Sequence, residues 1–237
     1  MKRTILAIIV FSSVCLLNAQ NISAIVEKYE KLVGIEKLNS FSTIKVTGTM
    51  SQMGMTMPIM MLEKNPDKIK VVSTINNSEL VQVVNGSKGY LINPMTGSSV
   101  PVELPADQVD QIKGNRMLKS SLKTQLDNGK LELIGNETTN GRASFRIKSV
   151  TAAGDVFMLI DKETYYVLAT QMTVNQMGME MSVEMRMSDF KNIQGVIMPM
   201  KIETYMGGQF SGSIIYKSIE FDIPIDDSEF ILKAANL

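Results

Sequence analysis

Short segments with a two-residue hydrophobic period, separated by turn residues, follow one another from residue 41 to residue 221. In the first segment Ile44, Val46 and Met50 alternate with polar residues, which is the pattern of a half-buried β-strand. Pairs such as Asn85-Gly86 favour tight hairpin turns. A long series of antiparallel strands twists, and a large open sheet curls or folds over, so the pattern predicts a curved antiparallel sheet.

Two helical segments interrupt this strand pattern. Ile22–Leu38 carries apolar residues at a helical period, and Pro105–Leu126 reads as two short helices. A curved sheet has a concave face, and we expect both segments to cover it as lids, with Gly114 and Asn115 as a hinge. The residues expected to form the central part of the lid are Val109, Ile112, Gly114, Asn115, Met117 and Leu118.

The first nineteen residues are typical of a cleaved secretory signal peptide. Lys2 and Arg3 precede the apolar run Ile5–Leu17, and Ala19 is the expected cleavage site. The mature chain, residues 20–237, is then expected to form one domain without a transmembrane anchor. Export of this kind predicts a periplasmic protein.

Composition excludes several chemistries. The chain has no histidine, and cleavage would remove its one cysteine, so the usual zinc sites and histidine-based or cysteine-based catalysis are not available. It has 24 basic and 24 acidic residues without a basic block, which argues against nucleic acid as a partner. We expect a non-enzymatic protein without a cofactor or a metal site.

A methionine-rich hexapeptide occurs twice. Gln52-Met53-Gly54-Met55-Thr56-Met57 returns with one change as Gln176-Met177-Gly178-Met179-Glu180-Met181, and methionine accounts for 19 residues in all. In an extended chain alternate residues share a face, so each copy lays an apolar stripe along a strand. Three interpretations are open: a lining for a lipid, a packed core beneath the helices, or a Cu(I) or Ag(I) site made of soft thioethers.

Three further motifs resemble a known family. Lys64-Asn65-Pro66 forms a turn, residues 78–94 carry a strand, Asn-Gly, a Gly-Tyr strand and Asn-Pro, and Asp227-Ser228-Glu229-Phe230 closes the chain. This order resembles the LolA-type periplasmic lipoprotein carriers and their outer-membrane and sensor relatives. The resemblance implies a mainly β fold, a curved antiparallel half-open barrel of about 11–12 strands with an N-terminal helix and a helical lid insertion.

One position departs from the family. Its carriers place an arginine directly before the turn proline, where it bonds to the lid, and here that position is Asn65. Lys64 or Lys68 could substitute, although lysine lacks the planar fork of arginine.

The resemblance implies a diverged carrier of lipoprotein acyl chains or another lipid, working in outer-membrane lipoprotein sorting with inner- and outer-membrane transfer components. A Cu(I) or Ag(I)-binding protein and an envelope sensor or scaffold are the alternatives. The residues expected to line the ligand cavity are Met53, Met55, Met57, Ile59, Met61, Met177, Met179, Met181, Met185, Met187, Met198 and Met200.

Overall fold

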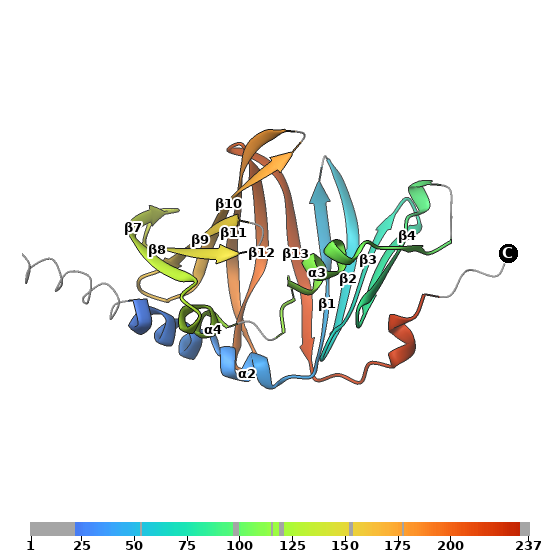
Figure 1. Ribbon diagram of the computed structural model, residues 1–237, viewed down its shortest axis with the longest axis horizontal. Coiled ribbons are helices and arrows are strands. Elements are labelled where there is room, and N and C mark those ends of the chain that lie inside the picture. Colours follow the sequence, from blue (N-terminus) through green and yellow to red (C-terminus); the bar gives the residue numbers. More distant parts are fainter. Residues whose placement is uncertain are drawn as a thin grey trace, which may run out of the picture. The chain divides into compact units, whose positions relative to one another are not determined.

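The computed structural model describes residues 22–52, 54–96, 100–114, 116–118, 121–151, 154–176 and 178–232. Within these ranges, 13 strands form one antiparallel sheet in the order β6-β5-β4-β3-β2-β1-β13-β12-β11-β10-β9-β8-β7 (Figure 1). Its edges are β6 and β7, so the sheet is not closed. The predicted mainly β, open antiparallel fold is confirmed.

The strands run almost continuously along the chain. Their bounds are β1 Thr43–Gln52, β2 Met55–Lys64, β3 Lys68–Ile75, β4 Ser78–Asn85, β5 Lys88–Ile92, β6 Val102–Glu103, β7 Leu131–Thr139, β8 Arg142–Thr151, β9 Gly154–Asp161, β10 Val167–Gln176, β11 Met179–Ile193, β12 Val196–Met206 and β13 Gln209–Phe221. A helix spans residues 22–33, followed by α2 Ile35–Ser40, α3 Ala106–Gly114 and α4 Leu122–Asp127, with 3-10 turns at η1 Pro94–Thr96 and η2 Asp227–Phe230.

The helix predictions need two corrections. The expected single helix Ile22–Leu38 is broken at Gly34, whose φ of 81° is a left-handed conformation that ends the first helix. In the insertion, Met117 and Leu118 precede the second helix and are not part of it. That helix, α4, begins only after Ser121, whose side chain accepts a hydrogen bond from the backbone of Thr124 as an N-cap.

The described chain divides into two compact units. Unit 1 contains the first helix, residues Ser121–Ser188 and residues Thr204–Phe210, and unit 2 contains Glu36–Ser120, Asp189–Glu203 and the residues from Ser211 onward. The strands β11, β12 and β13 each contribute residues to both units. The expectation of a single domain over residues 20–237 stays a prediction.

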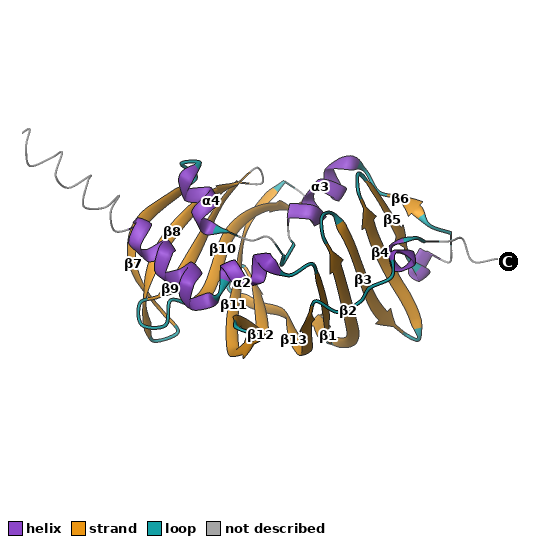
Figure 2. Cartoon of the chain, turned by 90° about the horizontal axis from the view of Figure 1, so that it is seen from below, coloured by secondary structure: helices purple, strands orange, loops and turns teal. Residues whose placement is uncertain are grey.

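The core of unit 1 lies between the helices and strands β8 and β9 (Figure 2). Ile25 and Val26 of the first helix pack with Ile147 and Ile160 of these strands. The helix also fixes α4, because the Glu30 carboxylate accepts hydrogen bonds from the Ser121 hydroxyl at 2.8 Å and from the Lys123 backbone N–H at 2.7 Å. The apolar period of residues 22–33 is therefore explained by this packing.

Unit 2 has a hydrophobic cluster on each face of its strands β2, β3 and β4. On one side Val109 of α3 packs on Ile69 and Val84. On the other side Phe230 of η2 packs against Leu62 and Val72. The strands β2, β3 and β4 are thus covered on both faces, which explains why their apolar residues do not alternate strictly with polar ones.

Some predictions fall outside the described residues. These are the signal peptide, Met53, Asn115 and Met177. Among the helices of the described part of the chain, none is both long enough and apolar enough to cross a membrane.

Candidate functional site

The first methionine stripe shares a face with the α3 helix. In an antiparallel pair, directly opposed residues point to the same side of the sheet. Met61 of β2 is opposite Val71 of β3, and the next residue of this parity, Glu63, is opposite Ile69. Because Ile69 packs with Val109 of α3, the stripe runs along the helix-covered face of unit 2.

Burial along this stripe is graded. Met55, at the hairpin end of β2, is 51% exposed, whereas Met57 is only 7% exposed. Ile59 and Met61 are half-buried. The stripe therefore presents apolar surface that is partly covered, rather than the sealed interior of a core.

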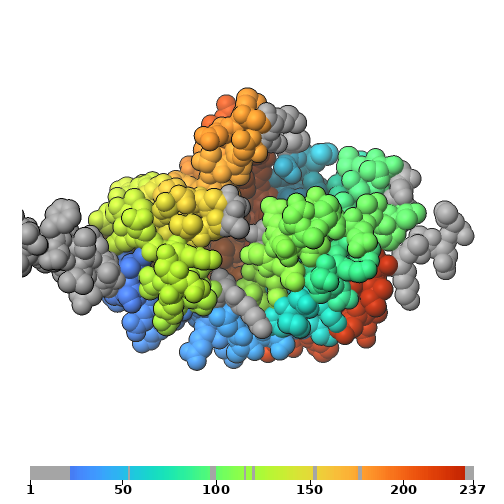
Figure 3. Space-filling view, viewed as in Figure 1, coloured from blue at the N-terminus to red at the C-terminus, as the bar shows by residue number. Residues whose placement is uncertain are grey.

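The second methionine stripe lies on the helix-packed face of unit 1. Met185 of β11 is opposite Thr170 of β10, and Thr170 is opposite Met158 of the core cluster with the first helix. Met181 and Met187 have the same parity as Met185, and all three are half-buried. Met179, at the hairpin end, is 63% exposed, and its hairpin projects from unit 1 in the space-filling view (orange, Figure 3).

Met198 and Met200 of β12 also belong to this sequence-predicted set. They lie in unit 2 and are buried. The structure thus places the described methionines of the set on strands of both units, and their role as a ligand lining stays a prediction.

The α3 helix docks on strand β5 through a glycine. A Cβ atom added at Gly89 would lie 2.8 Å from Val109 Cγ2, closer than real Cβ atoms come, and 3.1 Å from Leu104 Cδ1, which is a tight contact. Val109 is 2% exposed, and Ile112 is partly buried beside it. Two of the predicted lid residues therefore hold the helix on the sheet, while Gly114 is exposed at its end.

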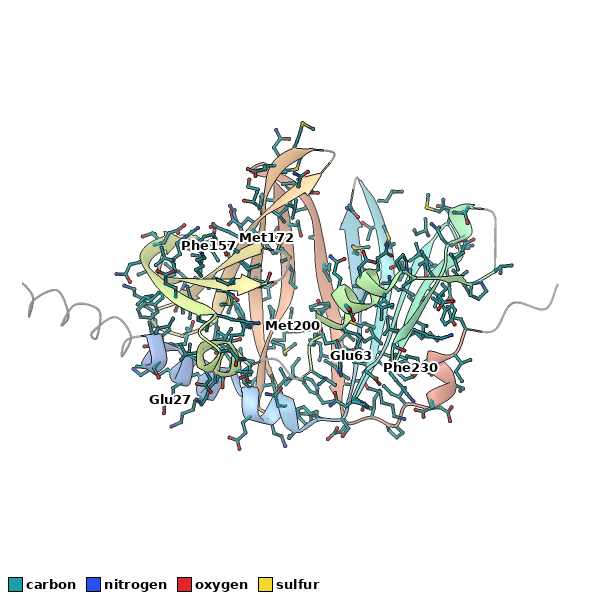
Figure 4. All side chains as sticks on the ribbon, viewed as in Figure 1. Glu27, Glu63, Phe157, Met172, Met200 and Phe230 are labelled. Atoms are coloured by element: carbon teal, nitrogen blue, oxygen red, sulfur yellow. The ribbon has the colours of Figure 1, made fainter. Side chains whose placement is uncertain are left out.

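A buried carboxylate holds the segment that follows α3. Glu63 of β2 is 1% exposed, and its oxygens accept hydrogen bonds from the backbone N–H groups of Met117 at 2.8 Å and Leu118 at 3.1 Å. Arg116 Nε lies 3.7 Å from Glu63 Oε2. Glu63, labelled in Figure 4, thus ties residues 116–118 to the sheet face that carries the first methionine stripe.

Arg116 extends this contact to the turn between β2 and β3. Its guanidinium donates to Asn65 Oδ1 at 2.6 Å and to the carbonyl oxygen of Pro66. Asn65 in turn donates to the carbonyl oxygen of Phe41 at 2.9 Å. The arginine that the family resemblance places in the turn is here on the insertion, and the turn supplies the acceptors. We call Glu63, Asn65, Pro66 and Arg116 the latch cluster.

Neither Lys64 nor Lys68 replaces the arginine of the family. Lys64 and Lys68 both pair with Asp227 of η2, each at 2.7 Å. Lys70 pairs with Glu229 in the same turn at 2.6 Å. These three lysines fasten the C-terminal segment to the sheet instead of the lid.

The electrostatics of Glu63 follow from its burial. Desolvation raises the pKa of this carboxyl above its ordinary value, while the N–H groups of Met117 and Leu118 and the charge of Arg116 act in the opposite direction. Arg116 Nε is buried without a hydrogen-bond partner in the described part of the chain. Because the desolvation of two buried charges offsets much of their attraction, this ion pair by itself is weak evidence for added stability.

Sequence reasoning missed both Glu63 and Arg116. A signal for Glu63 was present, since it continues the parity of Met57, Ile59 and Met61 and so places a charge on an apolar face. Arg116 carried no signal, because its partners are 50 residues or more away in the chain. Among the described residues, no group of three or more Asp, Glu, Cys or His side chains is placed to hold a metal ion.

The structure thus defines a class of mainly β proteins, in which an open antiparallel sheet carries a helix packed on one of its faces. No family model and no curated protein matches the sequence. Solved structures do match. A LolA superfamily protein from Nitrosomonas europaea is 14% identical, with 89% of this chain and 97% of that chain covered and a TM-score of 0.59.

Two further solved structures match most of this chain. An outer membrane lipoprotein-sorting protein domain from Vibrio parahaemolyticus is 11% identical over 85% of this chain and 95% of that chain, with a TM-score of 0.56. A DUF1329 family protein from Desulfovibrio piger is 13% identical over 86% and 96%, with a TM-score of 0.57. The chain therefore has a LolA-like fold, as the sequence motifs indicated.

Proposed function

We propose that this protein is a non-enzymatic periplasmic carrier that binds acyl chains of a lipoprotein or another lipid on its methionine-rich faces, in outer-membrane lipoprotein sorting. The observation that carries the proposal is the latch cluster. It fastens a short segment and a helix over a sheet face whose stripe, Met57 to Met61, is apolar, with Met57 buried and Ile59 and Met61 half-buried.

The energies suit reversible loading. Burying an acyl chain of about ten methylenes is worth about 8 kcal/mol before ordering costs, at about 0.8 kcal/mol each. Against this stand the contacts of Val109 and the latch cluster, which the ligand must replace with its own. Methionine suits such a face because its unbranched side chain repacks around acyl chains of different shape.

The fold likeness supports the same class of function. Two of the matching structures are named as a LolA superfamily protein and an outer membrane lipoprotein-sorting domain. By this proposal the protein would receive its cargo from an inner-membrane component and pass it to an outer-membrane component.

The test is lipid analysis of the purified protein together with uptake of a fluorescent fatty acid. Mass spectrometry of the protein as isolated should reveal bound lipid. Met57→Asp and Met181→Asp should each raise the Kd for the probe at least about tenfold, because a carboxylate on an acyl-binding face is costly to desolvate. Thr56→Asp and Asn175→Asp are matched controls of opposite parity to the two stripes and should bind like the wild type.

Leucine variants separate the apolar face from thioether chemistry. Met57→Leu and Met181→Leu nearly conserve volume and should leave fatty acid uptake intact. Loss of uptake in these leucine variants would indicate that sulfur itself is required. Wild-type uptake by both aspartate variants, with no lipid in the isolated protein, would refute the carrier proposal.

A further inference from the structure

Unit 1 contains a cleft on the side of its strands that faces away from the first helix. Arg146 of β8 and Phe157 of β9 alternate with Ile147 and Met158, which pack on that helix, so they point to the other side. The cleft has a volume of about 350 Å³, at the lower end of the range for small-molecule sites. Phe157 and Met172, two of its lining residues, are labelled in Figure 4.

One wall is a guanidinium stacked on an aromatic ring. The Arg146 guanidinium carbon lies 4.3 Å from the centroid of Phe157, a cation–π contact. The same guanidinium donates to Glu137 Oε2 at 2.6 Å and to Gln171 Oε1 at 2.8 Å. These bonds hold the Arg146 guanidinium in place and orient the side-chain oxygen of Gln171 toward it.

The opposite wall repeats this arrangement. The Arg186 guanidinium carbon lies 4.1 Å from the centroid of Tyr205 in β12, and Arg186 Nε is paired with Glu184 Oε1 at 2.7 Å. Tyr205 and Glu184 line the cleft. The cleft is therefore bounded by two aromatic rings whose partner cations are already neutralised.

This charge arrangement selects against ions. Each guanidinium has its own carboxylate, Glu137 for Arg146 and Glu184 for Arg186, so the cleft has no net charge among these groups. An anion would have to displace a carboxylate from its guanidinium, and a cation would meet the guanidinium groups. A neutral ligand requires neither.

The lining of the cleft includes hydroxyl groups and an amide that can bind a ligand. Thr173 and Ser182 are directly opposite each other on β10 and β11, and both are exposed. Neither hydroxyl is bonded to another residue within the described ranges, and Gln171 uses only its oxygen there, which leaves its NH₂ group to donate. Hydroxyl groups both donate and accept, so a ligand with several of its own hydroxyls is complementary to this set.

We propose that this cleft is a second binding site, for a small neutral polyhydroxylated ligand, chemically a sugar ring. The ring would place its hydroxyls on Thr173, Ser182 and the Gln171 amide, and its flat C–H surface against Phe157 or Tyr205. The hydroxyl and carboxylate groups of this site lie on the side of β11 opposite to Met181 and Met185 of the proposed acyl-binding stripe, because Ser182 and Glu184 alternate with these methionines along the strand.

Saturation-transfer NMR and calorimetry with the full mature chain test this inference. The neutral probes are maltotriose, cellobiose and N,N′-diacetylchitobiose, and the charged probes are glucuronate and inorganic phosphate, each at millimolar concentration. At least one neutral sugar should bind, and neither charged probe should bind as tightly. No binding by any neutral sugar, or tighter binding of a charged probe, would overturn the proposal.

Substitutions in the cleft test whether the sugar binds there. Thr173→Val combined with Ser182→Ala removes two exposed hydroxyls, so the fold should be retained, while the Kd for the sugar should rise at least about tenfold for the loss of two hydrogen bonds. Glu184→Gln should also weaken binding, whereas Glu180→Gln, an exposed position on the same strand and outside the cleft, should not. Unchanged sugar affinity in the double variant would overturn the assignment. Fatty acid uptake should be unaffected in all three, which separates this site from the proposed carrier function.

Discussion

At the scale of single residues, Arg116 connects the insertion to the sheet. Arg116→Lys should lose at least one of the two bonds to Asn65 and Pro66, because an ammonium lacks the planar fork that reaches both. We expect a local loss of about 1.4 kcal/mol, which is about a tenfold faster hydrogen exchange at the amides of Met117 and Leu118.

Lys31→Arg, at an exposed position of the first helix, is the control and should leave these exchange rates unchanged. Because a weaker latch costs a ligand less to open, Arg116→Lys should also bind the fluorescent fatty acid more tightly than the wild type. Unchanged exchange at residues 116–118 would show that Arg116 does not hold this segment.

Among the described carboxylates of unit 1, Asp161 accepts the most hydrogen bonds. Its Oδ1 accepts from the N–H groups of Glu163 and Thr164 at 3.0 and 2.6 Å, and Arg142 Nε lies 2.7 Å from Oδ2. Asp161→Asn should lower the free energy of unfolding by about 1.5–3 kcal/mol in neutral solution, since hydrogen bonds to a charged group are lost. Asp127→Asn, in an exposed pair on α4, should cost less than about 1 kcal/mol.

The cost of Asp161→Asn should depend on pH. Burial on its own would raise the pKa of Asp161, but the bonds from Thr164 and Glu163 and the charge of Arg142 lower it below the ordinary 3.8. A carboxyl whose pKa is lower in the folded than in the unfolded state stabilises the fold above the unfolded pKa, and this is lost as pH falls through the folded pKa. Urea unfolding of the two proteins should therefore converge below about pH 3.8, and a constant difference down to the lowest pH would contradict this role.

At the scale of elements, the docking of α3 depends on the missing side chain at Gly89. Gly89→Ala should destabilise the protein by about 1–3 kcal/mol, because its Cβ would overlap Val109 and Leu104. Val109→Ala alone leaves a cavity and should also destabilise. Combined, the two substitutions should cost less than their sum, since the smaller side chain at residue 109 makes room for the new methyl group.

Urea unfolding of the two single variants and the double variant measures this coupling. Gly114→Ala at the exposed end of α3, where an added Cβ meets no atom, is the control and should be close to neutral. Strictly additive costs for residues 89 and 109 would show that the helix does not rest on Gly89.

At the scale of the whole molecule, the two units share strands. Because β11, β12 and β13 each contribute residues to both units, unfolding of one unit removes hydrogen-bond partners from strands that continue into the other. We therefore expect a single cooperative urea transition. Far-UV circular dichroism and hydrogen exchange at amides of both units should report the same midpoint, and two separate midpoints would show that the units unfold independently.

Features with local sequence signals could be predicted, whereas features that depend on packing could not. The strands and hairpins were predictable because their signals are local: a two-residue period, and turn residues such as Asn85-Gly86, in which Gly86 adopts a φ of 66°. The break at Gly34 was not, since a glycine within a helical period can also continue a helix. The parity of each methionine stripe followed from the strand period, whereas its burial depended on which segments pack over it.

The sequence by itself determined an open antiparallel β fold, a helical insertion, two methionine stripes of fixed parity and the absence of histidine. These are properties of neighbouring residues or of composition. Only the tertiary structure decided that Arg116 fastens the insertion to Asn65 and Glu63, that Lys64 and Lys68 pair with the C-terminal segment, and that Phe157 and Tyr205, each in contact with a guanidinium, line one cleft. The first two contacts join residues 51 and 163 positions apart in the chain, and the aromatic contacts join neighbouring strands, so all of them are fixed by the register and packing of the sheet.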